Sequence, residues 1–216
     1  WTDEKFRYYR WAYYRMVENV DAQIGQVLDA LRASGQEENT LVVFSSDHGE
    51  MMGAHGLVMK RYFYEEAVRI PLLVSFKGRI RQGKVVDKPL VSNGLDLLPT
   101  LCDYAGITPP PGLRGRSLRL LLEGAPPPDW RAELVVECAN PESRMVHTGR
   151  YKYMVYGSGA NPEELFDLET DPGELNNLIG SEGHRDVAAA CRARLRELCN
   201  ETADAAGVQL ALSTSH

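Results

Sequence analysis

The hydrophobic positions near the N-terminus repeat at spacings of three and four residues, the period of an amphipathic helix. This pattern covers residues 5–34 and stops at Gly35, a residue suited to ending a helix. We predict one long helix whose apolar stripe faces the protein core. The stripe consists of Tyr13, Met16, Val17, Val20, Ile24, Val27, Leu28 and Leu31.

Two short apolar runs, 40–46 and 69–76, follow this helix. Both are rich in strand-forming residues and lack polar alternation, which is typical of strands buried on both faces of a parallel sheet. A helix is predicted from Asp96 through Tyr104, ending at Gly106. Helices alternating with buried strands predict an α/β fold with helices packed on a mostly parallel sheet.

The pattern changes beyond a proline-rich stretch at residues 107–129, which we predict to mark a domain boundary. Short strand-like runs separated by turn residues follow, and they predict a small antiparallel sheet. These runs are 133–138, 144–148, 152–156 and 164–168. A helix over 184–203 comes next, and the weakly patterned last dozen residues are expected to fray. The predicted domains are 1–125 and 126–216.

Composition narrows the class of protein. Hydrophobic residues make up 44% of the chain and charged residues 25%, which fits a globular protein and argues against disorder. The net charge is −6 and basic residues form no run, so nucleic acids and anionic membranes are poor partners. No apolar stretch approaches the roughly 20 residues of a membrane span. The four cysteines lack zinc-site or redox spacing and are interpreted as small buried hydrophobes.

The densest group of chemically active residues is Asp47-His48-Gly49-Glu50, with His55 and Lys60 shortly after it. Asp47 and His48 follow a predicted buried strand, and ligands of open α/β sheets bind beyond such strand ends. A carboxylate beside an imidazole suits a divalent cation, and a lysine suits an anion held there. The alternative is an ordinary strand-end turn, with Glu50 and His55 as solvated loop residues. The other histidines, His147, His184 and His216, are interpreted as structural or exposed.

Several segments, in order along nearly the whole chain, resemble the second half of the catalytic domain of the sulfatase family, in the alkaline phosphatase superfamily. Within the first half of the chain, the resembling segments are Val20–Gly25, Asn39–Glu50, Gly53–Gly56 with Lys60, and Arg69–Pro71. Further on they are Asp96–Thr100, Gly115–Leu118, Gly149–Tyr153 and Leu165–Leu178. The resemblance implies part of an alkaline-phosphatase-like α/β/α layer, followed by a small antiparallel sheet with a C-terminal helix.

This resemblance also implies a site. Asp47 and His48 would complete a divalent metal site, with calcium as the expected ion and manganese or zinc as alternatives. Lys60 would contact the sulfate of a small-molecule ester as a catalytic residue, and His55 would join it in binding substrate. The metal would polarise the ester oxygens, while Lys60 would neutralise charge in the transition state.

One part of the family pattern is missing. The family nucleophile is a formylglycine made within a Cys/Ser-x-Pro-x-Arg motif, and none of the four cysteines is followed two residues later by proline. We therefore expect a fragment that supplies half of an active site and is inactive alone, with the nucleophile in a missing N-terminal half. Alternatives are a phosphonate monoester or phosphodiester hydrolase of the same superfamily, or a non-catalytic sulfatase-like module. Exposed apolar faces would favour self-association or pairing with the N-terminal half.

Overall fold

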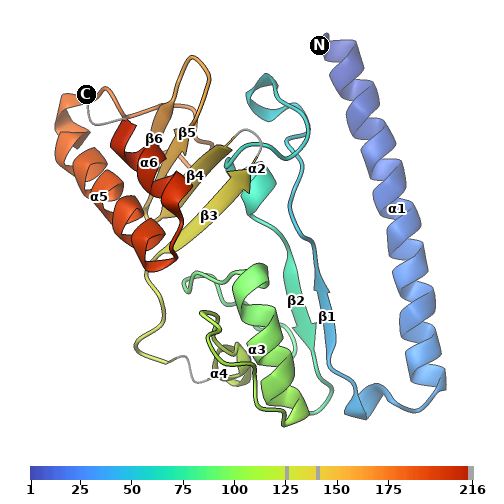
Figure 1. Ribbon diagram of the computed structural model, residues 1–216. Helices are drawn as coiled ribbons and strands as arrows, with labels where there is room; N and C mark the ends of the chain where they lie inside the picture. The colour runs from blue at the N-terminus through green and yellow to red at the C-terminus, as the bar shows by residue number, and fades with distance from the viewer. Residues whose placement is uncertain (125–126, 140–141, 214–216) are drawn as a thin grey trace. The chain divides into compact units, whose positions relative to one another are not determined.

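The computed structural model of the chain describes residues 1–124, 127–139 and 142–213, and these form two compact units (Figure 1). The first unit comprises residues 1–59 and 69–129, and the second comprises 60–68 and 130–216. The segment 60–68 thus leaves its sequence neighbours and joins the C-terminal unit. The predicted division between residues 125 and 126 falls on residues outside the described part and stays a prediction.

The first unit begins with helix α1, Asp3–Ala33. The Thr2 side chain caps it by accepting from the Lys5 backbone N–H at 3.4 Å, and acidic residues in its first turn complement the helix dipole. The predicted helix is confirmed, but the prediction that its stripe is core is wrong, because no residue of α1 is buried. Val27, for example, is 68% exposed. Periodicity identifies an apolar face, but it does not show what covers that face.

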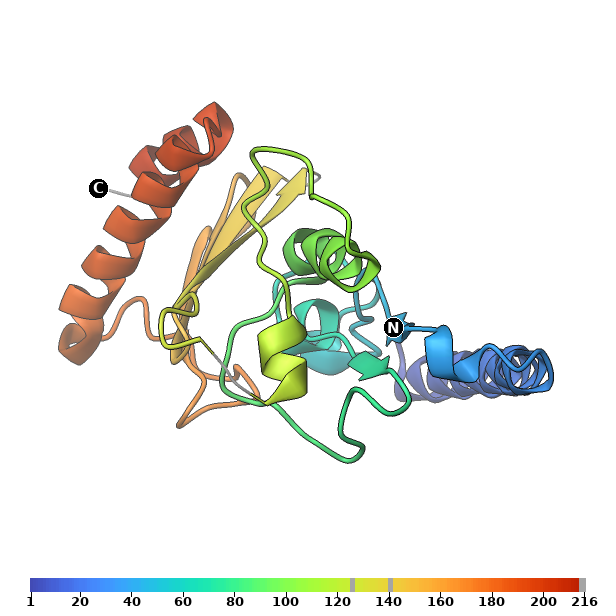
Figure 2. The same cartoon turned by 90° about the horizontal axis from the view of Figure 1, so that it is seen from below.

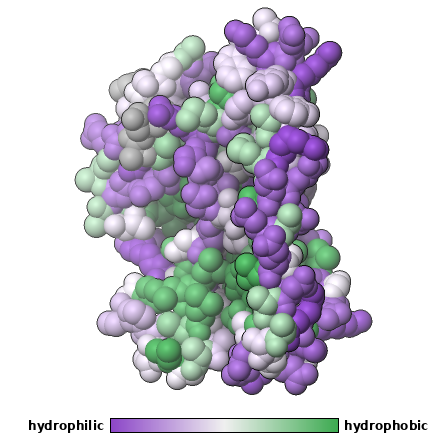
Figure 3. All heavy atoms as spheres, turned by 90° about the vertical axis from the view of Figure 1, so that its right-hand side faces the viewer, coloured by the Kyte–Doolittle hydropathy of each residue, from purple (hydrophilic) through white to green (hydrophobic). Residues whose placement is uncertain are grey.

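Two short strands form the sheet of the first unit: β1, Val42–Ser45, and β2, Leu72–Ser75. They pair antiparallel, with Val42 opposite Ser75, so the expected parallel pairing is wrong for these two strands. Burial on both faces is also wrong, since Phe44 and Leu73 are exposed. A four-residue apolar run carries no information about the direction of its neighbour. In the view of Figure 3, exposed hydrophobic residues gather in the lower half of the picture.

The rest of the first unit consists of short helices and one longer one. Two 3₁₀ turns, η1 (Glu37–Asn39) and η2 (Ala54–Gly56), flank β1 in sequence, and α4 (Arg119–Glu123) comes last. Helix α3, Asn93–Ala105, begins three residues before the predicted start and ends at Gly106 in the left-handed conformation, as predicted. The buried Asp96 carboxylate accepts the N–H groups of Ser92 and Arg116 at 2.9 Å each, and so secures the start of α3.

The second unit is built on an antiparallel meander, and the predicted sheet is confirmed. Its strands pair in the order β3 (Leu134–Ala139), β4 (Glu142–His147), β5 (Tyr151–Tyr156) and β6 (Glu163–Asp167). Glycines and other turn residues between apolar runs specify this arrangement, because consecutive antiparallel strands need only short connections. The short helix α2, Glu65–Val68, also belongs to this unit.

Helices α5 (Arg185–Glu201) and α6 (Ala205–Ser213) cover one face of the meander (Figure 2), and the turn η3 (Glu182–His184) precedes them. The core between helices and sheet consists of Val146, Tyr153, Val155, Leu165, Ala188, Cys191, Leu195, Cys199 and Ala211. Helix α6 corrects the expectation of a frayed end: the buried Gly207 and Ala211 anchor it despite its weak pattern. Cys191 and Cys199 are buried free thiols as predicted, while Cys102 and Cys138 are half-buried.

A buried ion pair fastens the turn after α5 to strand β4. The Arg144 guanidinium binds both carboxylate oxygens of Asp204, at 2.6 and 2.8 Å, and lowers the pKa of Asp204 to about 2. A carboxyl whose folded-state pKa is lowered stabilises the fold above its unfolded pKa. That contribution disappears as the pH falls through the folded pKa. The acid sensitivity of the second unit should therefore depend partly on Asp204.

We expect the Asp204→Asn variant to lose about 2 kcal/mol of unfolding free energy at pH 7. At pH 2 the variant and the wild type should differ far less, because the wild-type carboxyl is then about half protonated in the folded state and almost fully protonated in the unfolded state. Denaturant unfolding at both pH values measures this, with the exposed Asp186→Asn on α5 as a control. Equal losses of unfolding free energy at pH 7 and pH 2 would contradict a stabilising role of the ionised Asp204 carboxylate.

Candidate metal centre

Strand β1 delivers the two principal candidate residues, Asp47 and His48, to a tight turn at its carboxyl end. The Ser46 hydroxyl donates to the His48 carbonyl at 2.7 Å, and the His48 N–H donates to Asp47 Oδ1 at 3.0 Å. Asn93, at the start of α3, donates from its side-chain amide to the Ser46 carbonyl at 2.6 Å. These bonds fix the backbone conformation that presents Asp47 and His48. Sequence reasoning missed Asn93, whose position before a predicted helix gave no hint of this contact.

Asp47 and His48 direct donor atoms to one place. His48 Nε2 lies 3.4 Å from Asp47 Oδ2, while His48 Nδ1 lies 2.7 Å from the Gly49 carbonyl oxygen. Because a carbonyl only accepts, Nδ1 donates a proton there, which leaves Nε2, on the side that faces the Asp47 carboxylate, as the ring nitrogen available to an ion. The Asp47 side chain is 81% exposed, so an ion has access to it. This donor chemistry fits part of a divalent metal site.

The pair does not make a complete site by itself. Calcium takes about six to eight oxygen ligands, and zinc takes about four donors in total. Within the described residues, no group of three or more His, Cys, Asp or Glu side chains is arranged to hold a metal ion. Asp47 and His48 therefore fit as two ligands of a larger shell.

The loop that contains His55 is closed and strained. Glu50 Oε1 accepts the Met59 N–H at 2.6 Å and the Tyr9 hydroxyl at 2.9 Å, which gives Glu50 a structural role. Burial and the neighbouring Glu50 carboxylate raise the pKa of Tyr9. Met52, His55 and Met59 adopt positive φ angles, in the left-handed region that residues with side chains rarely occupy. Such strain is typical of functional loops, although it assigns no role to His55.

Lys60 lies on the exposed start of the segment 60–68 and belongs to the second unit, whereas Asp47, His48 and His55 belong to the first. The structure therefore joins Asp47 directly to His48, and the role of Lys60 stays a prediction. Of the isolated histidines, His147 accepts the Gly149 N–H at 3.0 Å and His184 lies 3.0 Å from the Ser181 hydroxyl, which fits structural roles. His216 lies outside the described residues.

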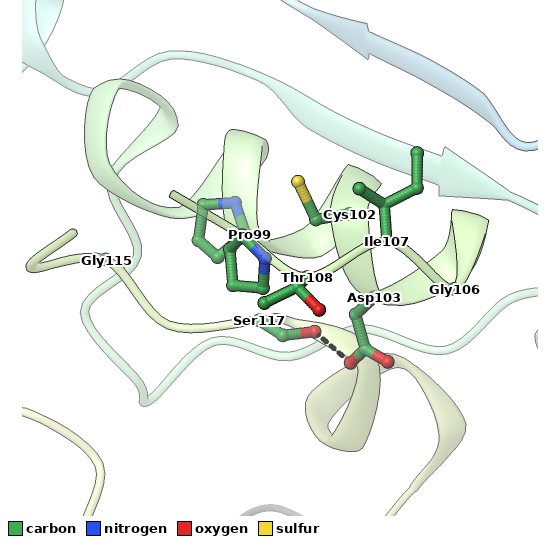
Figure 4. Close-up of a pocket in the computed structure, with 9 residues that line it drawn as sticks. Pro99, Cys102, Asp103, Gly106, Ile107, Thr108, Gly115 and Ser117 are labelled. Atoms are coloured by element: carbon green, nitrogen blue, oxygen red, sulfur yellow. Dashed lines mark hydrogen bonds between the residues drawn. The ribbon is translucent and has the colours of Figure 1, made fainter. Parts of the chain in front are cut away.

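A separate hollow of about 500 Å³ lies beside α3 in the first unit, and Figure 4 shows nine residues that line it. Its walls include Pro99, Cys102 and Ile107. The carboxylate in it, Asp103, accepts from Ser117 at 2.6 Å and pairs with Arg119 at 3.1 Å. Those contacts commit Asp103 to a structural role, and the hollow contains none of the predicted site residues.

The family model for the C-terminal region of N-sulphoglucosamine sulphohydrolase matches residues 53–201. The chain belongs to the sulfatase family, in the alkaline phosphatase superfamily, as the resemblance predicted. Membership implies a divalent metal cofactor in general terms and leaves the ion unspecified.

Three known proteins illustrate the relationship. The chain is 37% identical over 213 residues to Delta 4,5-hexuronate-2-O-sulfatase of Bacteroides thetaiotaomicron, covering 94% of this chain and 44% of that protein. A solved structure in complex with its substrate D-glucosamine-2-N,6-O-disulfate is 29% identical, with a TM-score of 0.80, over 88% of this chain and 40% of that one. The phosphonate monoester hydrolase of Agrobacterium radiobacter is 30% identical, with a TM-score of 0.82, over 93% of this chain and 43% of that one. The chain thus spans less than half the length of these relatives.

Proposed function

We propose that this chain contributes to a metal-dependent hydrolase of sulfate esters, in which Asp47 and His48 bind the metal ion and Lys60 contacts the ester. The observation that carries the proposal is the approach of His48 Nε2 and Asp47 Oδ2 to 3.4 Å at the end of β1. Calcium is the proposed ion, because carboxylate oxygen is its preferred ligand. Manganese and zinc, which accept imidazole more readily, are the alternatives.

Each residue has a distinct part in this proposal. The bound metal would polarise the ester oxygens. The Gly49 carbonyl holds the His48 ring in the orientation that directs Nε2 toward the Asp47 carboxylate, and Asn93 secures the backbone beneath both residues. The Lys60 ammonium would neutralise charge that develops on the ester in the transition state. His55 is proposed as a second substrate contact.

We propose a small sulfated sugar as the substrate class. The support is the similarity to a hexuronate-2-O-sulfatase and to a protein solved with a disulfated glucosamine. The similarity to a phosphonate monoester hydrolase supports the second candidate function, cleavage of phosphonate monoesters or phosphodiesters. An Asp-His metal pair suits both reactions, since each places negative charge on oxygens bound to a central atom.

Residues 1–216 contain no Cys-x-Pro-x-Arg motif from which the formylglycine nucleophile of the family would be made. We therefore expect no turnover by this chain alone, because positioning groups without a nucleophile leave only residual catalysis. The exposed apolar stripe of α1 supports a partner that covers it. We propose the N-terminal half of a sulfatase catalytic domain for this place, with self-association as the alternative.

The remaining partners follow from charge and from the substrate. No helix within the described part of the chain combines the length and apolar character that crossing a membrane requires. The net charge of −6 argues against nucleic acid as a partner. The partners that we propose are a small ester substrate and the protein surface that covers α1.

Replacing Lys60 by alanine in the full-length protein should lower kcat/KM for a sulfate monoester about 10²-fold, the usual effect of removing one transition-state charge contact. The adjacent and likewise exposed Arg61→Ala is the matched control and should stay within about threefold of the wild type. Turnover is compared for aryl sulfate, sulfated glucosamine and an aryl phosphonate. Preference for the phosphonate would favour the second candidate function, and hydrolysis of none of them would indicate a non-catalytic module.

A further inference from the structure

The face of the meander that points away from α5 and α6 is also covered, and the cover is the segment that begins with Lys60. Side chains alternate along β5: Tyr153 and Val155 join the core beneath the helices, so Lys152, Met154 and Tyr156 point to the opposite face. All three are buried, and Lys152 is 0% exposed. A lysine is almost never fully buried unless it is paired.

Two aromatic contacts place the segment 60–68 on this face. The Phe63 ring stacks on Tyr156 with ring centroids 5.9 Å apart, and the Tyr64 ring packs against Phe166 at 6.0 Å. The Tyr64 hydroxyl lies 3.1 Å from both carboxylate oxygens of Glu164. Burial and the Glu164 charge raise the pKa of Tyr64, so its hydroxyl remains a donor.

An ion triad around the fully buried Lys152 then fixes the segment at one register. Lys152 Nζ lies 2.8 Å from Glu65 Oε1 and 2.7 Å from Glu174 Oε1. The other oxygen of Glu174 accepts the Glu65 backbone N–H at 2.7 Å, so Glu174 holds both the lysine and the backbone of the segment. Glu174 itself adopts a positive φ while almost fully buried, a conformation that persists only where the surroundings impose it.

A charged triad fixes the position of the segment, whereas an apolar contact mainly adds stability. Apolar side chains of suitable volume usually give stability equal to or greater than that of buried charged groups, but charged groups tolerate only one pairing geometry. The triad ties Glu65 to a strand that lies 87 residues away in sequence. Only four residues separate Glu65 from Lys60, so a fixed Glu65 limits the positions that Lys60 can reach.

We propose that Glu65, Lys152 and Glu174 are positioning residues for Lys60, which hold the start of its segment where the Lys60 ammonium meets the ester. This inference rests on the role proposed above for Lys60. None of the three touches substrate in the proposal. Their effect is indirect, and misplacement of a contacting group by about 1 Å can lower a rate by about 10²-fold.

The test uses Glu65→Ala in the full-length protein. This change releases the segment but keeps the Lys152–Glu174 pair, so no buried lysine is left without a partner. The value of kcat/KM for the sulfate monoester should fall about tenfold or more. In a Lys60→Ala background, the same change should lower it by less than about threefold, because a residue that acts through Lys60 has nothing left to position. The matched control is Glu66→Ala, which changes the exposed carboxylate next to Glu65. It should have little effect on kcat/KM in either background.

Hydrogen exchange gives a second readout that needs no turnover. Amides of residues 61–66 should exchange faster in Glu65→Ala than in the wild type, while Glu66→Ala and the β4–β5 amides should show little change. Tyr64→Phe keeps the ring contact with Phe166 but removes the hydroxyl. It should also speed exchange of these amides, by less than Glu65→Ala does.

The outcomes of these experiments separate the role of Lys60 from the role of the residues that position it. Equal losses in both Lys60 backgrounds, or unchanged exchange in the segment, would overturn the inference. If Lys60→Ala alone has no effect on turnover, both the role of Lys60 and this inference fail. If Lys60→Ala lowers turnover and Glu65→Ala does not, only this inference fails.

Discussion

Replacing Asp47 by alanine in the full-length protein is expected to lower kcat/KM for the sulfate ester about 10³-fold and to weaken binding of calcium. A metal ion contributes several kcal/mol of charge stabilisation in the transition state, and about 4 kcal/mol corresponds to a factor of about 10³. Asp47 presents the exposed carboxylate of the donor pair, and His48 alone has a single nitrogen to offer. Calorimetry with calcium and with manganese measures the binding, and steady-state kinetics measures the rate.

The control for this prediction is Asp29→Ala on α1, which removes an exposed carboxylate from the same unit and should change neither quantity by more than about twofold. Tight metal binding that survives Asp47→Ala would remove Asp47 from the site. Tight calcium binding by residues 1–216 alone would show that the chain supplies more of the ligand shell than the Asp47–His48 pair.

The Lys152→Met variant should lose about 3–5 kcal/mol of unfolding free energy, the largest stability change that we expect in the second unit. The lysine side chain is fully buried and the Glu174 side chain is 1% exposed, so removing the ammonium leaves carboxylates without compensation. Burial already raises the pKa of Glu174, and Lys152 opposes that rise. The double variant Lys152→Met/Glu174→Gln should therefore recover part of the loss.

Denaturant unfolding followed by circular dichroism gives the comparison. Lys77→Met removes an exposed lysine that pairs with Glu37 at 2.9 Å, and it should lower the unfolding free energy by less than about 1 kcal/mol. A loss in Lys152→Met no larger than that of Lys77→Met would show that the buried triad adds nothing to stability.

Local pattern was sufficient for much of the fold. Helix α1, helix α5 and the four strands of the meander lie where period and turn residues placed them, because these signals arise within one element or between neighbours. The antiparallel pairing of β1 with β2 was not predictable in this way, since its direction depends on the path that the chain takes from Ser46 to Pro71. Helix α6 was missed because its stability comes from packing of Gly207 and Ala211, not from an amphipathic stripe.

The site residues, like the elements of the fold, were predictable where the signal is local in sequence and were missed where it depends on distant segments. Asp47 and His48 adjoin in sequence, so a motif was enough to propose them as a pair. The Lys152 network joins three separate segments, and distance in sequence hides such contacts. A usable signal existed, however: Lys152 interrupts an otherwise apolar and aromatic strand, Tyr151–Tyr156, where a solvated lysine would be out of place.

The exposed start of α1 has an optical consequence. Trp1 and Trp11, two of the three tryptophans in the chain, lie at the start of this helix and on it, respectively, and both indoles are largely exposed. Indole emission shifts to shorter wavelength when water is excluded, so the fluorescence of this protein is weighted toward the surroundings of α1. The colour of its emission thus reports whether the start of that helix, around Trp1 and Trp11, faces water or another protein surface, without any added label.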